Sequence, residues 1–320
     1  MVALAEDQNM SSLYSKHILD IIVCPYCKES LEWTSKGAKC STCKEEYARA
    51  ASGALDLRLR RKKRCQLQFE LGTKLLPRSG FEFGVLQNNP IPEVDFSNTK
   101  VPYHLSEELM SYFPKAKRKA SLMLDLGCGA TIHKKVCEYA GFEYVGLDYN
   151  SPKAPLLGDA HALPFKDNSF EFILSIAVLE HIRFPFVMMS EVYRVLEPMG
   201  KFIGSVAFLE PFHGDSFYHH THLGTYNSLQ HAGFDIVQVA PNEKWSVLIA
   251  QSSMALFPKM PSPISEAVVM PLYVLHKIWW RLGSFVTHLK EANEKNRILK
   301  TTGSLFFVAN KPSLSQKQLP

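Results

Sequence analysis

The sequence predicts a doubly wound α/β fold with a mostly parallel sheet, and two observations support this prediction. Residues 122–148 run as an apolar strand, a glycine-rich turn, a helix and a second strand that ends in an acid. Segments typical of strands and helices continue to alternate through residues 170–207. The chain of 320 residues can hold one α/β domain of roughly 200 residues together with additional segments.

The composition is that of a globular protein, with 46% apolar residues and a net charge of +5. This mild excess of basic residues permits an acidic partner such as RNA or a membrane surface without requiring one. The start of the chain lacks the apolar run of a signal peptide, and no stretch is apolar enough to span a membrane. We therefore expect a cytoplasmic protein, with peripheral contact at a membrane as an open alternative.

Four of the seven cysteines form two CxxC pairs, Cys24 with Cys27 and Cys40 with Cys43, separated by twelve residues. Two such pairs at this spacing predict a structural zinc site in which four thiolates complete a tetrahedron. The alternatives are disulfides or a redox motif, but a redox CxxC should open a helix in a thioredoxin-like context, which is absent. No ligand position is left for water, so the Zn²⁺ is expected to stabilise folding. This cysteine usage also favours a reducing, intracellular compartment.

The basic run 58–64 follows the cysteine-rich segment. It is either a contact for nucleic acid or anionic lipid, or a solvated linker. Residues 65–102 contain four prolines and are expected to be irregular. Ser106 or its neighbour is expected to cap a short helix over 106–113, which Pro114 ends.

The glycine turn that follows the strand at 122–126 suits a nucleoside ligand. Gly127 and Gly129 let a ligand approach the backbone, and the next helix, expected from Thr131, offers unpaired N–H groups to an anion. Asp148, at the tip of the second strand, can accept both hydroxyls of a ribose. A dinucleotide fingerprint would place a third glycine at position 132, where the chain has Ile132, so NAD binding is disfavoured.

The next strand connection is unusually short. Few residues separate Asp148 from the apolar segment before Gly158, whereas a parallel crossover normally needs a dozen or more. We therefore expect a loop in place of a helix and a short third strand.

Asp125, Gly127 and Gly129 resemble motif I of the class I S-adenosylmethionine-dependent methyltransferases, with Thr131 where the motif usually has its last glycine. Residues 158–175 resemble the corresponding stretch of the type 11 methyltransferases, as do residues 191–200, where Met199 replaces a glycine. The resemblance covers about residues 104–240 and 302–311. It implies a Rossmann-like sheet of seven strands whose last two, 234–240 and 303–309, form an antiparallel hairpin.

The resemblance also implies the cofactor S-adenosyl-L-methionine and its contacts. Asp159 would accept from the adenine amino group, and the N–H of Ala160 would reach the adenine ring. The residues expected to bind the cofactor are Asp125, Gly127, Cys128, Gly129, Asp148, Tyr149, Asp159, Ala160 and Ser175.

The methyl acceptor is expected above residues 175–181. His181 and His220 are candidates for a general base, because histidine titrates near neutral pH. The alternative is a scaffold histidine, since proximity to a reactive sulfonium can suffice. Four histidines fall within residues 213–222, and a metal site, a substrate contact and a structural role all remain open for them.

The cysteine-rich segment, residues 17–58, resembles the small zinc-ribbon proteins that partner tRNA methyltransferases and the zinc ribbon at the front of some rRNA guanine methyltransferases. Residues 241–300 separate the last two strands and are expected as a helical insertion. Its segment 263–282 places Trp279 and Trp280 beside basic residues, as in a helix at a membrane surface. A cap on the domain or a dimer surface is the alternative.

The expected organisation is a disordered lead at 1–16, a zinc ribbon at 17–58, a basic and proline-containing linker at 59–102, a methyltransferase domain at 103–240 plus 301–312, and the helical insertion at 241–300. The first hypothesis, supported by the resemblance and by the aromatic insertion, is methyl transfer to a small-molecule, glycan or lipid-like acceptor. RNA methylation with the ribbon as substrate arm is the second hypothesis. The base-clamping motif of enzymes that methylate exocyclic amino groups of bases is absent after residue 174. Its absence argues against RNA methylation at those amino groups, but not against RNA methylation at other positions. A non-catalytic cofactor-binding module is the third hypothesis.

Overall fold

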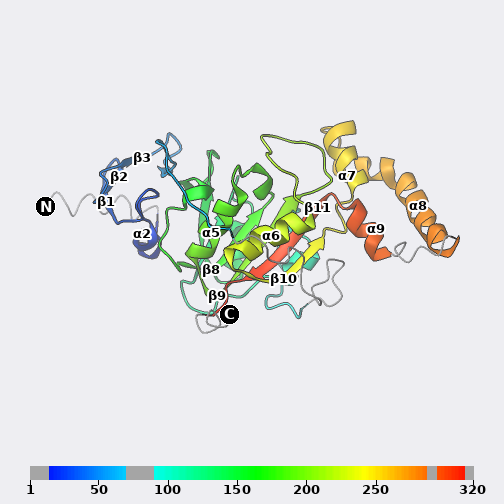
Figure 1. Cartoon of the computed structure of the whole chain (residues 1–320), viewed down its shortest axis with the longest axis horizontal. Coiled ribbons are helices and arrows are strands. Elements are labelled where there is room, and N and C mark those ends of the chain that lie inside the picture. The colour runs from blue at the N-terminus through cyan, green and yellow to red at the C-terminus, as the bar shows by residue number, and fades with distance from the viewer. Residues whose placement is uncertain (1–13, 70–89, 287–293, 314–320) are drawn as a thin grey trace.

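The computed structural model describes residues 14–69, 90–286 and 294–313, which form one large sheet with flanking helices and a small ribbon at one end (Figure 1). Most of the expected disordered lead, residues 1–13, lies outside the described residues. So do residues 70–89 of the linker and 287–293 of the insertion.

The large sheet has eight strands. Their order across the sheet is β10 (Asp235–Pro241), β11 (Ser304–Asn310), β9 (Leu196–Ala207), β8 (Phe170–Ile176), β5 (Leu122–Leu126), β6 (Glu143–Asp148), β7 (Leu156–Leu157) and β4 (Leu55–Asp56). The strands from β9 to β4 are parallel, and β11 runs antiparallel to both of its neighbours. The doubly wound, mostly parallel fold is thus confirmed, including the expected hairpin of β10 and β11.

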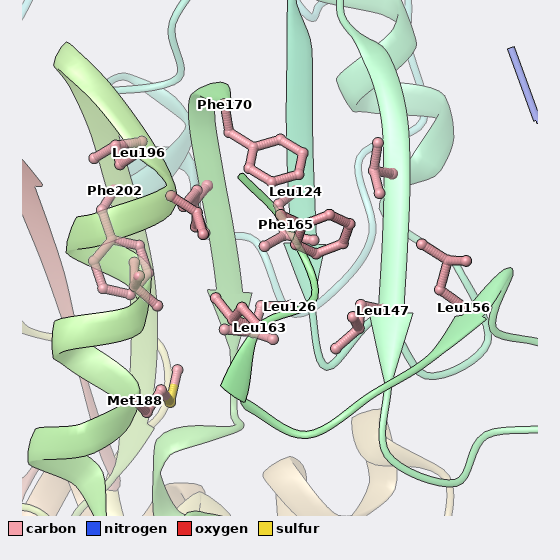
Figure 2. Close-up of a cluster of buried hydrophobic side chains, with 14 of the residues drawn as sticks. Leu124, Leu126, Leu147, Leu156, Leu163, Phe165, Phe170, Met188, Leu196 and Phe202 are labelled. Carbon is pink, nitrogen blue, oxygen red and sulfur yellow. The ribbon is translucent and has the colours of Figure 1, made fainter. Parts of the chain in front are cut away.

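The core lies between the sheet and the helices that cover it. Every residue of β5 and β8 is buried, as expected for parallel strands that are covered on both faces. Figure 2 shows Leu124, Phe170 and Phe202 from the strands in one buried cluster with Met188 of helix α5 (Pro185–Val195). The buried side chains of α5 recur at helical spacing, so one face of the helix is committed to the sheet.

The shorter helices only partly follow their local sequence signals, and α3 (Glu107–Met110) ends three residues before the expected 113. Ser106 caps α3 by accepting from the N–H of Leu109 at 3.2 Å. Helix α6 (His222–Ala232) ends before Gly233. Helix α4 (Lys134–Tyr139) begins three residues later than expected, because Thr131 has a φ of +58° and cannot continue a right-handed helix.

The third strand is short, as expected from the brief crossover. β7 consists of Leu156 and Leu157, and only turns and bends separate it from β6. Both leucines are buried and pair with β6 on one side and β4 on the other. A two-residue strand between two neighbours depends on both of them for its position.

The ribbon contains helix α2 (Lys16–Ile21) and a three-stranded antiparallel sheet of β1 (Leu31–Thr34), β2 (Gly37–Cys40) and β3 (Glu46–Ala48). Residues 55–57 were expected within it, but β4 leaves the ribbon and becomes the eighth strand of the large sheet. Leu55 and Leu57 are fully buried there, and the N–H of Leu57 donates to the carbonyl of Leu157 at 2.8 Å. The burial of these two leucines against the main core explains why β4 pairs with the large sheet.

Further contacts fix the ribbon to the domain of the large sheet. The N–H of Val23 donates to the carbonyl of Pro164 at 2.9 Å. The Lys28 ammonium donates to Glu191 of α5 at 2.8 Å and to the carbonyl of Leu163 at 2.9 Å. These side chains are mostly shielded from water, so the ribbon and the sheet form one packed body.

The insertion is helical and lies at the end of the molecule opposite the ribbon (Figure 1). It comprises α7 (Val247–Gln251), a π-helical turn at Ser252–Leu256, α8 (Ser262–Val286) and α9 (Glu294–Thr301). Within the described residues, none of the helices is both long and apolar enough to cross a membrane. Much of α8 is exposed, with Trp279 at 73% and Phe285 at 82% of their full exposure.

The ribbon metal and the sheet edge should respond together. We expect Cys43→Ser to lose the zinc and to accelerate amide exchange at Leu156 and Leu157, because the ribbon holds β4 against β7. Metal content and hydrogen exchange by mass spectrometry measure the two effects. Cys65→Ser is the matched control, since Cys65 is exposed and outside the four-cysteine set. Zinc loss with unchanged exchange in β7 would contradict this coupling.

Candidate functional site

The four ribbon cysteines converge as the spacing predicts. All four Sγ atoms lie within 4.8 Å of one another, with Cys24–Cys43 at 3.5 Å and Cys27–Cys40 at 3.4 Å. Thiolates around one Zn²⁺ at about 2.3 Å are roughly 3.8 Å apart, so the set fits that ion after a small expansion. The Tyr47 hydroxyl lies 3.0 Å from the Cys24 sulfur and can donate to it, which is typical of a residue that orients a metal ligand.

The glycine turn is held tightly between β5 and β6. The N–H groups of Gly127 and Cys128 both donate to the carbonyl of Leu147, at 2.8 and 3.2 Å. Gly127 has a φ of +75°, and a Cβ there would lie 2.3 Å from a methyl group of Val178. Gly129 has a φ of +49°, but a Cβ there would meet nothing within 4 Å. The first glycine is therefore needed for packing, whereas the second borders open space.

Asp148 stands at the rim of this open space. Its Oδ2 accepts from the N–H of Gly129 at 2.9 Å, and its Oδ1 accepts from the N–H groups of Asn150 and Ser151 at 3.0 and 2.9 Å. The Ser151 hydroxyl donates in turn to the carbonyl of Gly129 at 2.6 Å. The carboxylate is thus fixed at the tip of β6 beside the glycine turn, where the cofactor ribose is expected.

Asp125 is placed differently from the other expected cofactor residues. It is fully buried, accepts from the Tyr144 hydroxyl at 2.7 Å, and lies 3.3 Å from Nδ1 of His133. Burial, followed by the charge of Asp125, raises the pKa of Tyr144, so this tyrosine stays protonated and donating. Asp125 therefore braces β5 against β6 from inside the sheet.

Asp159 precedes a short 3₁₀ turn, η1 (Ala160–Ala162), that begins at the expected Ala160. Its Oδ1 accepts from the backbone N–H of His161 at 2.9 Å and lies 2.6 Å from Nδ1 of that ring. Nε2 of His161 accepts from the N–H of Phe184 at 3.1 Å, so Nδ1 carries the proton and donates to Asp159. Burial works to raise the pKa of Asp159, but these bonds outweigh it and hold that pKa below its usual value. Both contacts use Oδ1.

The remaining expected cofactor residues differ in their exposure to solvent. Tyr149 is exposed, and its carbonyl accepts from the Arg58 guanidinium at 3.2 Å. Cys128 is buried beneath the turn. Ser175, at the end of β8, is buried, and its hydroxyl has no hydrogen-bond partner among the described residues. The contact from Arg58 was missed at the sequence level because it joins segments 91 residues apart.

The two candidate bases differ in their surroundings. His181 ends the 3₁₀ turn η2 (Leu179–His181) after β8, and burial lowers its pKa, so it is neutral and able to accept a proton at pH 7. His220 is buried, and its Nε2 lies 3.3 Å from the carbonyl of Leu179, to which it can donate. This bond, together with one from the N–H of His220 to the carbonyl of Ala207 at 2.8 Å, ties the histidine-rich loop to the sheet.

Glu180 is a functional candidate that the sequence pattern did not single out. It is fully buried beside His181, and neither carboxylate oxygen has a hydrogen-bond partner among the described residues. Burial is the main reason that the pKa of Glu180 is raised to about 7. The backbone N–H of Glu180 acts against this shift, and the Glu210 carboxylate adds to it. In the sequence, the only indication of a role for Glu180 was its position directly before His181.

Several residues of the basic run are paired with neighbouring groups of the ribbon and of β4. Arg58 forms a salt bridge with Asp56 at 2.8 Å, and Arg61 pairs with Glu45 at 2.9 Å. The Arg61 guanidinium also lies 4.1 Å from the centre of the Tyr26 ring, and Lys63 donates to the carbonyl of Pro25. Part of the positive charge is therefore neutralised within the ribbon, so the run offers less to a phosphate backbone than its sequence suggests.

Comparison with known proteins identifies the domain. Residues 124–204 match the family model described as a methyltransferase domain. An uncharacterized protein of Methanocaldococcus jannaschii is 32% identical over 104 residues, which cover 30% of this chain and 46% of the relative. The human mitochondrial arginine-hydroxylase NDUFAF5 is 28% identical over 116 residues, covering 32% of this chain and 31% of the relative. The chain spans less than half the length of the curated relatives it matches.

Solved structures with a similar arrangement include a chain from the complex of the Haloferax volcanii Trm112 methyltransferase activator with a methyltransferase. It is 18% identical and covers 66% of this chain and 90% of its own, with a TM-score of 0.43. Phosphoethanolamine N-methyltransferase 2 of Haemonchus contortus is also 18% identical, covering 62% of this chain and 50% of its own with a TM-score of 0.38.

The family match and the mostly parallel sheet agree on the kind of domain. Residues 124–204 match a methyltransferase domain, and a cysteine-rich ribbon precedes it. The matched residues contain the glycine turn, Asp148, Asp159 and the Glu180–His181 pair.

Replacing each glycine of the turn by alanine should lower the stability of the protein by a different amount. We expect Gly127→Ala to lower the free energy of unfolding by about 2–4 kcal/mol, through its positive φ and the collision with Val178. Gly129→Ala should cost only about 1–2 kcal/mol, from its φ alone. Urea unfolding of both variants measures the difference, and equal losses would contradict the assignment of Gly127 to packing.

Proposed function

We propose that this protein transfers the methyl group of S-adenosyl-L-methionine to a small-molecule, glycan or lipid-like acceptor. The observation that carries the cofactor assignment is the placement of Asp148 beside the Gly129 turn, within the segment that matches the methyltransferase domain. The acids and the turn lie at the carboxyl ends of parallel strands, where ligands bind in sheets of this kind.

The residues around the turn suit the parts of the cofactor in a definite order. Asp148 would accept from the ribose hydroxyls, and the open space at Gly129 would admit the backbone-facing part of the ligand. The Asp159 oxygen that His161 does not use would accept from the adenine amino group. When bound, the sulfonium supplies an activated methyl group, so the protein needs chiefly to align the acceptor.

Two alternatives remain as outcomes of the experiments below. RNA methylation is less favoured because Arg58 is paired with Asp56 of β4 and Arg61 with Glu45 of the ribbon. A binding module without catalysis is less favoured because the turn and both acids are retained. The division into a ribbon at 17–58, a domain at 103–240 plus 301–312, and an insertion at 241–300 is part of this proposal.

Asp148 is the first residue to test. Asp148→Asn should weaken S-adenosylmethionine binding about 10- to 100-fold, since hydrogen bonds to a charged group contribute about 1.5–3 kcal/mol. Calorimetric titration measures the affinity, and thermal unfolding checks that the variant is folded. Asp235→Asn, at an exposed position on β10, is the matched control. Unchanged affinity in Asp148→Asn would overturn the placement of the ribose.

The exposed apolar side chains of α8 favour a methyl acceptor that is itself apolar or that lies in a membrane. Ten large apolar side chains in this helix are exposed: Ile264, Val268, Met270, Leu272, Val274, Leu275, Ile278, Trp279, Leu282 and Phe285. Such a long apolar surface is unusual for a helix in water and marks a contact with a partner or a lipid surface. The Lys277 ammonium lies over the Tyr273 ring at 4.6 Å on the same helix, which combines basic and aromatic groups as interfacial helices do.

The acceptor class can be tested with methyl-labelled cofactor and a cell extract separated into RNA, protein, lipid and small-molecule pools. We expect label in the lipid or small-molecule pool, and none above background with Asp148→Ala. If the acceptor is lipid, the double variant Trp279→Ser/Phe285→Ser should lower its labelling about tenfold or more, because two large apolar contacts are lost. Ile91→Ser, at an exposed apolar residue outside α8, should label normally. Label confined to RNA would overturn the proposed acceptor class.

A further inference from the structure

Three side chains beyond the cofactor residues converge after β8. Glu180 and His181 come from η2, and His213 comes from the histidine-rich loop, 32 residues further along the chain. Their ligating atoms all lie within 4.8 Å of one another. We call these three residues the Glu–His–His cluster.

The strongest feature of this cluster is the buried, unsatisfied carboxylate of Glu180. The side chain is fully buried, and neither oxygen has a hydrogen-bond partner among the described residues. A buried carboxylate without partners is costly, because its desolvation is not offset. The backbone here is well fixed, since the carbonyl of Glu180 accepts from the N–H groups of Phe217 and Tyr218 at 2.7 and 3.1 Å. The carboxylate is therefore held in place without an ordinary partner.

The two histidines can present ring nitrogens to the same point. Nδ1 of His213 lies 3.3 Å from the carbonyl of Pro211 and can donate to it, which leaves Nε2 as the acceptor. A backbone carbonyl on one ring nitrogen is the usual arrangement behind a histidine that binds a metal through the other. The His181 and His213 rings meet edge to face with centroids 5.3 Å apart, so both border the same small volume.

The local charge also favours a cation. Glu210 is close enough to Glu180 for the two carboxylates to repel each other. Trp245 donates to Glu210 at 3.3 Å and orients it, but this neutral donor does not cancel its charge. Two acids beside two histidines make a region that a divalent ion would neutralise.

The cluster adjoins the cofactor site. Val178, two residues before Glu180, is the residue whose methyl group would meet a Cβ at Gly127 of the cofactor turn. The cluster therefore lies where the methyl acceptor is expected, at the carboxyl end of β8 beside that turn.

We propose that Glu180, His181 and His213 bind one divalent transition-metal ion, which positions the oxygen atom of the methyl acceptor. Two imidazoles and one carboxylate suit Zn²⁺, Fe²⁺ or Co²⁺, and three protein ligands leave coordination positions open. Tetrahedral ligands at about 2.1 Å from an ion are roughly 3.4 Å apart, so side-chain rotations from the present separations complete the site.

The role of the ion deepens the proposed function and rests on it. An ion beside the acceptor hydroxyl lowers its pKa and fixes its direction. The hydroxyl proton goes to solvent, an oxygen lone pair bonds to the methyl carbon, and the electrons of the broken carbon–sulfur bond remain on sulfur. The products are the methyl ether or ester of the acceptor and S-adenosylhomocysteine.

The ion site is tested by titrating the full-length, zinc-loaded protein with Co²⁺ alone, without cofactor or acceptor. We expect one Co²⁺ per chain, with visible ligand-field bands but no thiolate charge-transfer band, while the ribbon zinc is retained. Glu180→Gln and His213→Ala should each weaken Co²⁺ binding at least tenfold. His213→Ala changes a loop residue and is expected to fold even if Glu180→Gln does not. His219→Ala, at an exposed neighbour in the same loop, is the matched control.

The failures of the two proposals can be told apart. Absence of Co²⁺ binding beyond the ribbon, a thiolate band, or equal binding in His213→Ala and His219→Ala would each overturn the metal site. S-adenosylmethionine affinity measured on the same samples tests the proposed function separately, because neither Glu180 nor His213 is assigned to the cofactor. With metal bound, label in an O-methyl product that is lost in His213→Ala supports the acceptor role, and label only in an N- or C-methyl product would overturn it.

Discussion

The structure depends above all on how the glycine turn is tied to Asp148. One carboxylate oxygen accepts from the amide of Gly129, and the carbonyl just before Asp148 accepts from both Gly127 and Cys128. These bonds join the ends of β5 and β6, so the turn and the acid cannot move apart. Because Val178 packs directly against Gly127, the segment that follows β8 is positioned by the same turn. The proposed cofactor and acceptor sites therefore share one fixed structural element.

The strand that follows the ribbon, β4, stabilises the edge of the large sheet. Without β4, a two-residue strand such as β7 would be marginal, since its ladder is short and one edge would be open. β4 closes that edge, and Arg58 then reaches the carbonyl of Tyr149 beside Asp148. The four-cysteine ribbon is thus connected, through a few backbone pairs, to the loop that carries Asp148.

The two ends of the molecule serve different physical purposes. The ribbon end is well packed, and two of its basic residues form salt bridges with the acids Asp56 and Glu45. The α8 end leaves a long apolar face in water, which the fold itself does not use. In a molecule whose core is otherwise well covered, that contrast favours the insertion over the ribbon as the element that meets an acceptor or its surface.

The sequence by itself determined the class of fold, the zinc-type cysteine spacing and the glycine turn with Asp148. These depend on local patterns: strand hydrophobicity, fixed CxxC spacing and the φ values that glycine permits. Only the tertiary structure decided that β4 joins the large sheet, that Asp125 is fully buried, and that Glu180 meets His213. Each of these joins residues distant in sequence or depends on competition for burial, and no local period encodes such a choice. The histidine-rich loop shows this limit clearly, because its four histidines are visible in sequence but only folding selects His213 for the cluster.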